Sequence, residues 1–410
     1  MARSGETHTT GSDHQSIDAF HDVLVVGGGN GGVSAAGRVQ RLGCRNVAVI
    51  EPRAVHRYRP LLNYVGGGQA KLDELTSTMA SALSNGISHY RESVRLIDPQ
   101  QRIVTTDAGR RLRYGDLVLA PGLLPDVDAI PGLAAAYHAG WATTTFVPEA
   151  ATQLWPMIKS TRSGTVVFTV PPEPAPCGGS ALKPLFLACD FWQREGVLES
   201  MRVVLAVPTD TVLGVPFIDR RLEPYLEKYG VEVHTGTTLS EIDPESRQVT
   251  LEGPRGAVPV HNVAMAHLVP PYRPGAWIAE SGLAQSETGL VDVEPQTFQH
   301  CRFDTVWAVG DAAALNTRPS GGGLRKQVKI LGDNIIAARL SKEFGRYDGY
   351  TVVPITVERH RALVAEFDRD GRPTGSVPLI DLTRPRVPFW FFDRYLEPLV
   401  YQHALLKGRV

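Results

Sequence analysis

Short runs of β-branched and apolar residues alternate with longer amphipathic stretches along most of this chain. Residues 22–52 open with DVLVVG, pass through an amphipathic stretch that ends at Gly43, and close with NVAVIE. Continuous apolar runs of this length are typical of strands in a parallel sheet that is buried on both faces. The segment therefore predicts a strand, a glycine turn, a helix and a second strand.

A second unit of the same kind lies in the middle of the chain. It contains GTVVFTV at 164–170, an amphipathic stretch at 182–196, MRVVLAV at 201–207, and a helix followed by a strand within 216–237. The pattern elsewhere predicts a loop at 56–68, a β-meander at 92–119, a late strand within 305–315 that returns to the first unit, and helices at 72–84, 144–160 and 325–344. Strands that alternate with helices in this way predict an α/β fold with two Rossmann-like dinucleotide-binding domains.

The turn after the first strand carries a nucleotide-binding fingerprint. Gly27, Gly29 and Gly32 form the spacing G-x-G-x-x-G with Gly28 between them, and Glu51 ends the next strand. The first glycine makes the turn, the second lets the backbone approach a pyrophosphate, and the third lets the helix pack on the strand. The helix N-terminus offers N–H donors to phosphate, and Glu51 is placed to accept hydrogen bonds from a ribose diol.

A second motif decides which dinucleotide is expected. The late strand TVWAVG ends in Gly310-Asp311, which looks like the second FAD motif of two-dinucleotide-fold flavoproteins, where the aspartate meets the ribityl chain. The pairing of the two motifs predicts FAD, bound without a covalent link. We expect Arg59, Val94 and Gly321 to contribute further cofactor contacts.

These motifs set the expected organisation of the chain. We expect a disordered leader at 1–20, an FAD-binding domain in two parts at 21–145 and 291–346, a second Rossmann-like domain at 146–290, and a C-terminal flavin-covering segment at 347–410.

The second unit lacks the fingerprint of the first. After GTVVFTV the chain continues as PPEPAPCGGSALKP, and the four prolines of PPEPAP lack backbone N–H donors. Such a loop cannot hold a pyrophosphate through a row of N–H groups. Cys177 stands in this loop, so we expect a thiol here and an electron donor other than a nicotinamide.

Composition narrows the classes of partner and compartment. The net charge is −1, so a nucleic-acid partner is not expected. Four cysteines in 410 residues do not form a disulfide framework, and the first 20 residues lack the pattern of a targeting signal. No apolar run is long enough to span a bilayer. We expect a cytoplasmic protein, with peripheral contact to the cytoplasmic membrane as the open question.

Taken together, these residues resemble the sulfide:quinone oxidoreductase family, in its mitochondrial-like branch. The markers are the fingerprint, HRYRP at 56–60, VGGG at 65–68, CGG at 177–179 followed by Lys183, PPYRPGAW at 270–277, VGDAAAL at 309–315, YDGYTVVP at 347–354 and LVAEFD at 363–368. They cover nearly the whole chain from about residue 22 to residue 408.

The resemblance implies a mechanism and also shows where this chain departs from it. In the family, sulfide attacks a sulfur bridge between two cysteines that flank the flavin, and electrons pass to ubiquinone. Cys177 matches the first cysteine, and Lys183 matches a lysine that would favour the thiolate. Val353 stands where the second cysteine is expected, Pro319 replaces a lysine, and the pair 63–64 is Asn-Tyr in place of Trp-Thr.

Three functions follow as hypotheses. The first is an FAD-dependent oxidoreductase that acts on sulfide, a thiol or a persulfide through Cys177 and passes electrons to a quinone or another acceptor. The second is a related scaffold that oxidises an organic substrate, and the third is a protein that retains FAD for structure. Cys189, Cys44 and Cys301 are weaker candidates for a second redox sulfur, because the patterns around them are those of a core helix, a helix end and a strand entrance.

The last residues leave one further alternative open. The stretch 387–410 is rich in aromatic and aliphatic residues and poor in charge. The resemblance implies a quinone site and membrane contact here, and such a segment suits an interface. A helix packed over the flavin domain, or a homodimer contact, is the alternative.

Overall fold

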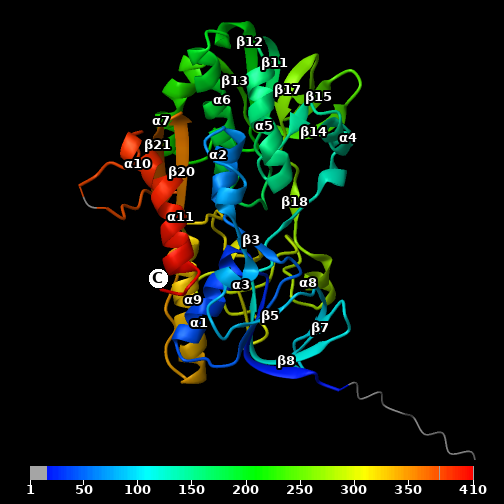
Figure 1. Cartoon of the computed structure of the whole chain (residues 1–410), viewed down its shortest axis with the longest axis vertical. Coiled ribbons are helices and arrows are strands. Elements are labelled where there is room, and N and C mark those ends of the chain that lie inside the picture. Colours follow the sequence, from blue (N-terminus) through cyan, green and yellow to red (C-terminus); the bar gives the residue numbers. More distant parts are fainter. Residues whose placement is uncertain (1–15, 378, 410) are drawn as a thin grey trace, which may run out of the picture.

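The protein is an elongated molecule with one α/β unit at each end (Figure 1). A computed structural model describes residues 16–377 and 379–409. Most of the leader predicted at 1–20 lies outside the described residues, and its last two positions already belong to a strand, because β1 begins at Ala19. The predicted α/β class, with two Rossmann-like units, is confirmed.

The first unit is built on a seven-stranded sheet in the order β5-β2-β1-β8-β7-β6, with β19 paired to β8. β1 lies parallel to β2 and β8, so the carboxyl ends of these strands meet at one edge. Helices α1 and α9 pack against each other beside the sheet (Figure 1). The elements are β1 (Ala19–Val26), α1 (Asn30–Arg41), β2 (Val47–Ile50), β5 (Ser88–Tyr90), β6 (Val94–Asp98), β7 (Ile103–Thr106), β8 (Arg111–Leu119), β19 (Val306–Ala308) and α9 (Leu324–Arg339).

The second unit has a five-stranded parallel sheet in the order β10-β17-β11-β12-β13. An antiparallel three-stranded sheet, β14-β15-β16, packs against helix α4, and buried residues of both contribute to one small hydrophobic core. The elements are α4 (Leu133–His138), β10 (Ala142–Thr143), α5 (Pro148–Ser160), β11 (Gly164–Thr169), α6 (Leu182–Arg194), β12 (Met201–Ala206), α7 (Pro216–Lys228), β13 (Val231–His234), β14 (Thr238–Asp243), β15 (Gln248–Gly253), β16 (Gly256–Val260) and β17 (Val263–His267).

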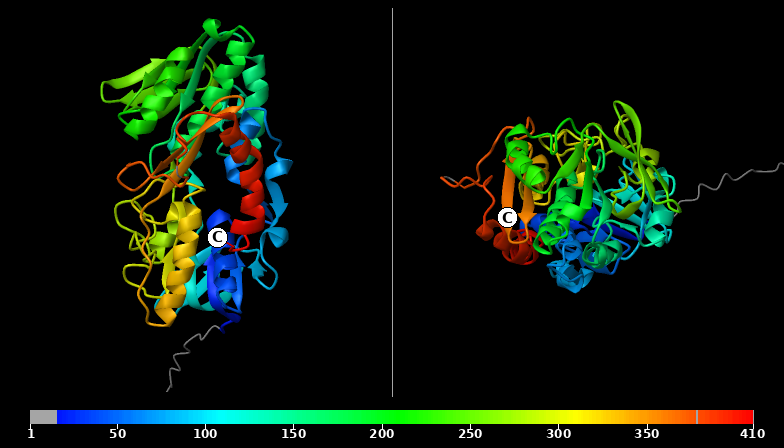
Figure 2. Two further views of the ribbon diagram at one scale, coloured as in Figure 1. Left: turned by 90° about the vertical axis from the view of Figure 1, so that its left-hand side faces the viewer. Right: turned by 90° about the horizontal axis from the view of Figure 1, so that it is seen from above.

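The C-terminal segment links the two units. Strands β20 (Thr351–Glu358) and β21 (Arg361–Phe367) form an antiparallel hairpin that packs on α6. A run of helical turns follows, α10 (Val387–Phe391), a π-helical turn at Phe392–Leu396, α11 (Glu397–Val400) and a second π-helical turn at Tyr401–Leu405. This run, the C-terminal helix, lies along the side of the molecule and ends beside α1 (Figure 2, left).

Two local predictions are wrong. The stretch 56–68, expected to be a loop, holds β3 (Val55–Arg57) and α2 (Leu62–Gly66). The helix expected at 72–84 is broken into a 3-10 turn (Asp73–Leu75), β4 (Thr76–Thr78) and α3 (Met79–Ala82). β3 and β4 pair with each other, and this pairing uses the residues that the sequence pattern assigned to a loop and a helix. Two further short elements complete the fold. β9 (Leu124–Pro125) pairs with β18 (Tyr272–Arg273), and helix α8 (Ala276–Glu280) packs against β6.

Candidate cofactor and thiol site

The turn after β1 needs glycine at two positions and leaves open space at a third. A Cβ on Gly27, whose φ is +103°, would lie 2.2 Å from the Ala120 carbonyl oxygen. One on Gly32 would lie 1.8 Å from the Gly27 carbonyl oxygen. A Cβ on Gly29 would meet no atom within 4 Å. The first and third glycines of the fingerprint therefore serve the protein's own packing, and the second lies where a ligand can approach.

Glu51 ties the end of β2 to this turn. Its Oε2 accepts a hydrogen bond from the Gly28 N–H at 2.8 Å, and its Oε1 accepts from the backbone and side chain of Arg53. Burial opposes ionisation of Glu51, but the bonds from Arg53 and Gly28 outweigh it and the pKa is lowered. Glu51 is thus a carboxylate at neutral pH. A ribose would have to share its oxygens with Arg53, whose side chain is 65% exposed and free to move aside.

Three other predicted residues gather at the same turn. A Cβ on Gly321 would lie 3.7 Å from Pro60 and 4.0 Å from Asn30, so Gly321 lies beside both the 59–60 segment and the start of α1. Burial raises the pKa of Asp311, and the Arg59 guanidinium opposes that rise, which places these two side chains within electrostatic reach. Arg59 also donates to the Phe146 carbonyl at 2.8 Å.

Val94 lies apart from this group. It begins β6, pairs with Thr106 and packs partly buried against the first core. The described contacts do not join Val94 to the fingerprint, so its role stays a prediction.

The residues at the turn fit a dinucleotide. The first turn of α1 has no acidic residue and no side-chain cap at Gly29, so its N–H donors are not taken by the protein's own side chains. Free N–H groups at a helix N-terminus attract phosphate oxygens. Glu51 stands at one end of the turn for a ribose, and Asp311 lies in the loop after β19 for a polar chain.

Cys177 sits in a strained backbone conformation at the start of a short 3-10 turn, Gly178–Ala181. Its φ is +50°, in the left-handed region that non-glycine residues rarely adopt. Burial raises its pKa to about 11, Lys183 opposes the rise, and Asp311 adds to it. Cys177 is therefore a thiol at neutral pH, and it lies within electrostatic reach of the residue predicted for the flavin.

Lys183 has a partner that the sequence did not predict. Its Nζ lies 2.7 Å from Oδ2 of Asp393, and both side chains are almost fully buried. The Tyr64 hydroxyl donates to the same carboxylate oxygen at 2.6 Å. Lys183 still lowers the pKa of Cys177, as the sequence analysis expected, but a carboxylate of the C-terminal helix offsets part of its charge. Asp393 is the single acidic residue in the aromatic run FWFFDRYL, and this isolated charge is the sequence feature from which a buried partner for a cation could have been predicted.

Val353 lies opposite the loop that carries Cys177. A Cβ on Gly179 would lie 3.4 Å from Val353 and 2.6 Å from Leu213, so Val353 faces the loop that carries Cys177. Val353 is buried in the second core, against which Cys177 also packs. The position opposite the thiol loop is therefore apolar and holds no second sulfur.

The other cysteines do not complete a pair. All four are free in the described structure. Cys189 is fully buried on α6, and burial raises its pKa far above the ordinary value. Cys44 is buried beside Arg339, and Cys301 is exposed near the Asp292 carboxylate.

The second turn has no phosphate cradle. β11 ends at Thr169 and α6 begins only at Leu182, so the helix N-terminus does not follow the strand directly as it does in the first unit. The next loop, after β12, is closed by Asp219, which accepts hydrogen bonds from Thr211, from the Leu213 N–H and from the Val215 N–H. The first of these places therefore lacks a helix N-terminus directly after its strand, and the second is closed by the protein's own Asp219.

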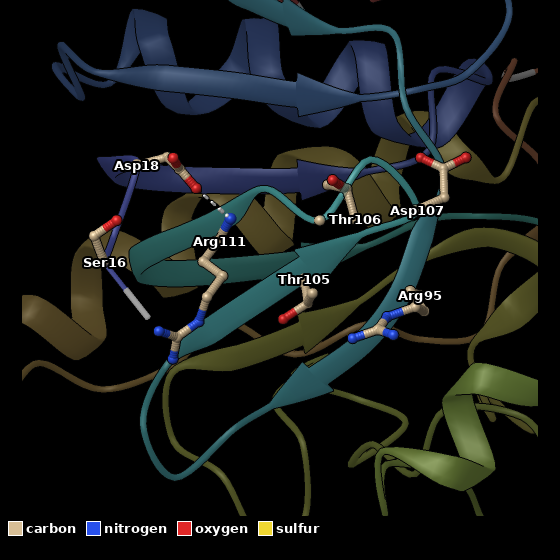
Figure 3. Close-up of a pocket in the computed structure, with 8 residues that line it drawn as sticks. Ser16, Asp18, Arg95, Thr105, Thr106, Asp107 and Arg111 are labelled. Carbon is tan, nitrogen blue, oxygen red and sulfur yellow. Dashed lines mark hydrogen bonds between the residues drawn. The ribbon is translucent and has the colours of Figure 1, made fainter. Parts of the chain in front are cut away.

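A surface pocket of about 370 Å³ lies away from this site (Figure 3). Its lining includes Asp18, Arg95, Asp107 and Arg111, which belong to the β-meander and to the residues just before β1. The fingerprint follows the opposite end of β1, roughly 25 Å away at about 3.3 Å per residue. The charged side chains that line the pocket are of both signs, and Asp18 already accepts a hydrogen bond from the Arg111 N–H at 2.7 Å. This pocket is not part of the cofactor site.

The fold and the matches to known proteins define a class of protein, the flavin-dependent oxidoreductases. Residues 21–157 match the family model described as pyridine nucleotide-disulphide oxidoreductase. The chain is also similar to two solved structures that share its fold. It matches the sulfide:quinone oxidoreductase of Aquifex aeolicus with a TM-score of 0.79 at 18% identity, over 95% of this chain and 91% of that one. It matches a chain in the mitochondrial ATP synthase of Tetrahymena thermophila with a TM-score of 0.80 at 19% identity, over 99% of both.

A relative in sequence identifies the family. The chain is 30% identical over 391 residues to the mitochondrial sulfide:quinone oxidoreductase of Dictyostelium discoideum, which covers 94% of this chain and 86% of that protein. The chain belongs to the sulfide:quinone oxidoreductase family. It is a flavin-dependent oxidoreductase, as the sequence predicted.

Proposed function

We propose that this protein binds FAD at the first turn and oxidises a reduced sulfur species through Cys177, with electrons passing to a quinone or another acceptor. The observation that carries the proposal is the placement of Cys177. The thiol is held in a left-handed backbone conformation, within electrostatic reach of both Lys183 and Asp311. Backbone strain of this kind is concentrated at functional sites.

The residues of this chain supply the sulfur chemistry and the binding. When bound, FAD takes up two electrons and passes them on. Cys177 is protonated at neutral pH, because burial raises its pKa to about 11, so it must lose its proton before it acts as a nucleophile. Lys183 favours that loss. Gly29 would lie beside the phosphates of the bound nucleotide, and Glu51 would accept a hydrogen bond from its ribose.

Val353 shapes the choice of substrate. Since no second cysteine faces the thiol loop, the second sulfur has to come from solution, as sulfide, a small thiol or a persulfide. Forming an S–S bond between it and Cys177 would release two protons and two electrons, and FAD would accept the electrons. Two of the similar proteins named above, from Dictyostelium discoideum and Aquifex aeolicus, are sulfide:quinone oxidoreductases, which supports a sulfur substrate and a quinone acceptor.

Anaerobic titration of the purified yellow protein with sulfide tests the proposal. We expect the flavin absorbance to bleach, and to recover when a short-chain quinone is added. In Cys177→Ser the bleaching should be lost while the FAD content stays the same, because a hydroxyl is a poor soft nucleophile. Bleaching by sulfide that is as fast in Cys177→Ser as in the natural protein would contradict the role of Cys177.

A second function is favoured by the apolar surroundings of the thiol loop. Val353 and Leu213 both face Gly179, and an apolar wall suits the carbon skeleton of an organic substrate better than an ionised sulfide. Under this alternative, sulfide leaves the flavin oxidised and an organic reductant bleaches it. The same titration, run in parallel with a panel of alcohols, amines and thiols, separates the two functions.

The cofactor itself is tested at Glu51. Glu51→Arg removes the acceptor for a ribose and for the Gly28 N–H, so we expect a largely colourless apoprotein. Precipitation of the natural protein with acid should release all of its FAD, since no covalent link is expected. Normal FAD occupancy in Glu51→Arg would show that the fingerprint is assigned wrongly.

The outer face of the C-terminal helix supports a contact with a membrane or with a second copy of the chain. Its exposed large side chains are Val387, Phe391, Phe392, Tyr395, Leu396 and Leu399. The inner face packs on the protein, through Trp390, Asp393 and Arg394. Among the described residues no helix is long and apolar enough to cross a bilayer. Binding to lipid vesicles would support a peripheral membrane contact, and a concentration-dependent dimer in sedimentation would support the alternative.

A further inference from the structure

The carbonyl of Gly28, within the fingerprint, is held by a side chain outside it. His56, at the centre of β3, is 3% exposed, and its Nδ1 lies 2.8 Å from the Gly28 carbonyl oxygen. A carbonyl only accepts, so the proton of this bond is on Nδ1. Nε2 of the neutral ring is then an acceptor.

The donor to that acceptor comes from the end of the chain. The Tyr401 hydroxyl lies 2.5 Å from Nε2 of His56, and the two rings stack with centroids 5.7 Å apart. Burial raises the pKa of the Tyr401 phenol, so it keeps the proton that it donates. Burial also lowers the pKa of His56, against opposing effects of Gly28 and Glu51, while Arg53 and Lys407 add to the lowering. Tyr401, His56 and Gly28 thus form one buried chain of hydrogen bonds.

This chain of hydrogen bonds fixes the orientation of the Gly28–Gly29 peptide, which would face the phosphates of a bound dinucleotide. The bond between Gly28 and Gly29 is trans, so its C=O and N–H point in opposite directions. Because the Gly28 carbonyl points to His56, the Gly29 N–H points away from it. No acceptor for that N–H occurs within residues 16–377 and 379–409. The Gly28 N–H is held by Glu51, so both sides of the residue are fixed before any ligand arrives.

The end of the chain is anchored firmly enough to serve this role. Lys407 donates to the carbonyls of Ser81, Ala82 and Leu83 at 2.8 to 2.9 Å. A Cβ on Gly37 would lie 2.7 Å from the Leu406 carbonyl, and one on Gly408 would lie 2.4 Å from the Arg38 nitrogen. Two glycines therefore let the backbone of the C-terminal tail lie directly on α1, the helix that the fingerprint opens.

We infer that Tyr401, acting through His56, is a positioning residue for the dinucleotide: it holds the Gly28–Gly29 peptide with its N–H available to a phosphate. This inference rests on the proposed FAD site and extends it to the C-terminal helix. Losing the Tyr401 hydroxyl leaves the ligand contacts in place but lets this peptide rotate, so affinity falls for any ligand that carries the diphosphate.

The test measures binding to the apoprotein by fluorescence titration, with FAD and with ADP as the probe that carries only the adenosine diphosphate part. Tyr401→Phe should weaken both ligands by the same factor, about threefold to tenfold, the value expected for one buried hydrogen bond. Tyr395→Phe is the matched control, because Tyr395 lies on the exposed face of the same helix. Unchanged affinity of Tyr401→Phe for FAD and ADP would overturn the inference.

A second pair of variants keeps the test decisive if Tyr401→Phe folds poorly. In His56→Asn the amide can still donate to the Gly28 carbonyl, whereas His56→Leu cannot. His56→Asn should bind ADP more tightly than His56→Leu, and equal affinities would also overturn the inference. Natural protein that binds neither FAD nor ADP would instead contradict the proposed cofactor site.

Discussion

The two α/β units place different chemistry at the same point of the same fold. In the first, α1 begins directly after the glycine turn, its N-terminus has no side-chain cap, and a Cβ at Gly29 would meet no atom within 4 Å. In the second, twelve residues separate the end of β11 from the start of α6, and they carry prolines and Cys177. The first turn suits an anion, while the second presents a thiol.

The difference shows how little of the fold has to change for a new role. Both sheets are parallel at these strands, and both turns lie at the carboxyl edge where α/β proteins bind ligands. The residues of the two turns differ, and under the proposed function the first turn binds a cofactor while the second offers a reactive side chain to it. Function here depends on the turns, and the sheets provide the frame.

The strongest test of the comparison is Gly29→Ala. The new Cβ would meet no protein atom within 4 Å, and the φ of −76° at Gly29 suits alanine, so the apoprotein should keep its melting temperature. The same Cβ occupies the space that the pyrophosphate needs, and FAD affinity should fall by about a hundredfold. Gly31→Ala is the control, since its Cβ points toward Ala120 and Val309. Retention of FAD by Gly29→Ala would remove the contrast between the turns.

The second test asks whether the second turn can bind a nicotinamide dinucleotide that reduces the flavin. We expect anaerobic NADH and NADPH to reduce the flavin at less than about a hundredth of the rate seen with a good reductant, because the 171–184 loop lacks a phosphate cradle. Stopped-flow absorbance of the flavin is the measurement. Rapid bleaching by one equivalent of NADH would mean that the two units bind dinucleotides alike.

The third test follows the thiol through its titration. Because the pKa of Cys177 is raised to about 11, its thiolate fraction at pH 8 to 10 should rise about tenfold per pH unit and level off only above pH 11. Iodoacetamide labelling, quantified for the Cys177 peptide by mass spectrometry, reports this profile. Lys183→Met should move the levelling to higher pH, since Lys183 lowers the pKa. A plateau below pH 9 would show that the buried environment does not act as described.

The smallest expected effect is a gain. Val353→Cys places a second sulfur opposite the thiol loop. We expect the rate of sulfide turnover with a quinone to rise by only about a few-fold, because the new thiol is well placed but the residues around it are unchanged. Cys177→Ser combined with Val353→Cys should lose the gain. No change in Val353→Cys, together with an inactive natural protein, would favour the organic substrate.

Local patterns were enough to predict much of the fold, whereas the cofactor contacts of the motif residues stay a prediction. The apolar runs around Gly27 and Glu51 predicted β1, α1 and β2, because the spacing of apolar residues that distinguishes a strand from a helix is visible within a short stretch of sequence. The late strand that ends before Gly310 was placed correctly in the first sheet. The motif residues 59, 311 and 321 do gather near the turn.

What the sequence missed depends on contacts between distant segments. Asp393 pairs with Lys183 across 210 positions, and Tyr401 reaches His56 across 345. Nothing in the local pattern of an aromatic helix indicates which of its polar groups will be buried, or against what. The short strands β3 and β4 were missed for the same reason, since each exists only through pairing with the other.

The left-handed backbone at Cys177 has a consequence for how this position would change over generations. A left-handed conformation costs a residue with a side chain roughly 1–2 kcal/mol, a cost that glycine avoids. A lineage with no use for the thiol would therefore lose little, and would gain stability, by replacing this cysteine with glycine. Under the proposed function, the cysteine at this point gives up stability for reactivity, and we expect relatives that have lost sulfur chemistry to carry a glycine in its place.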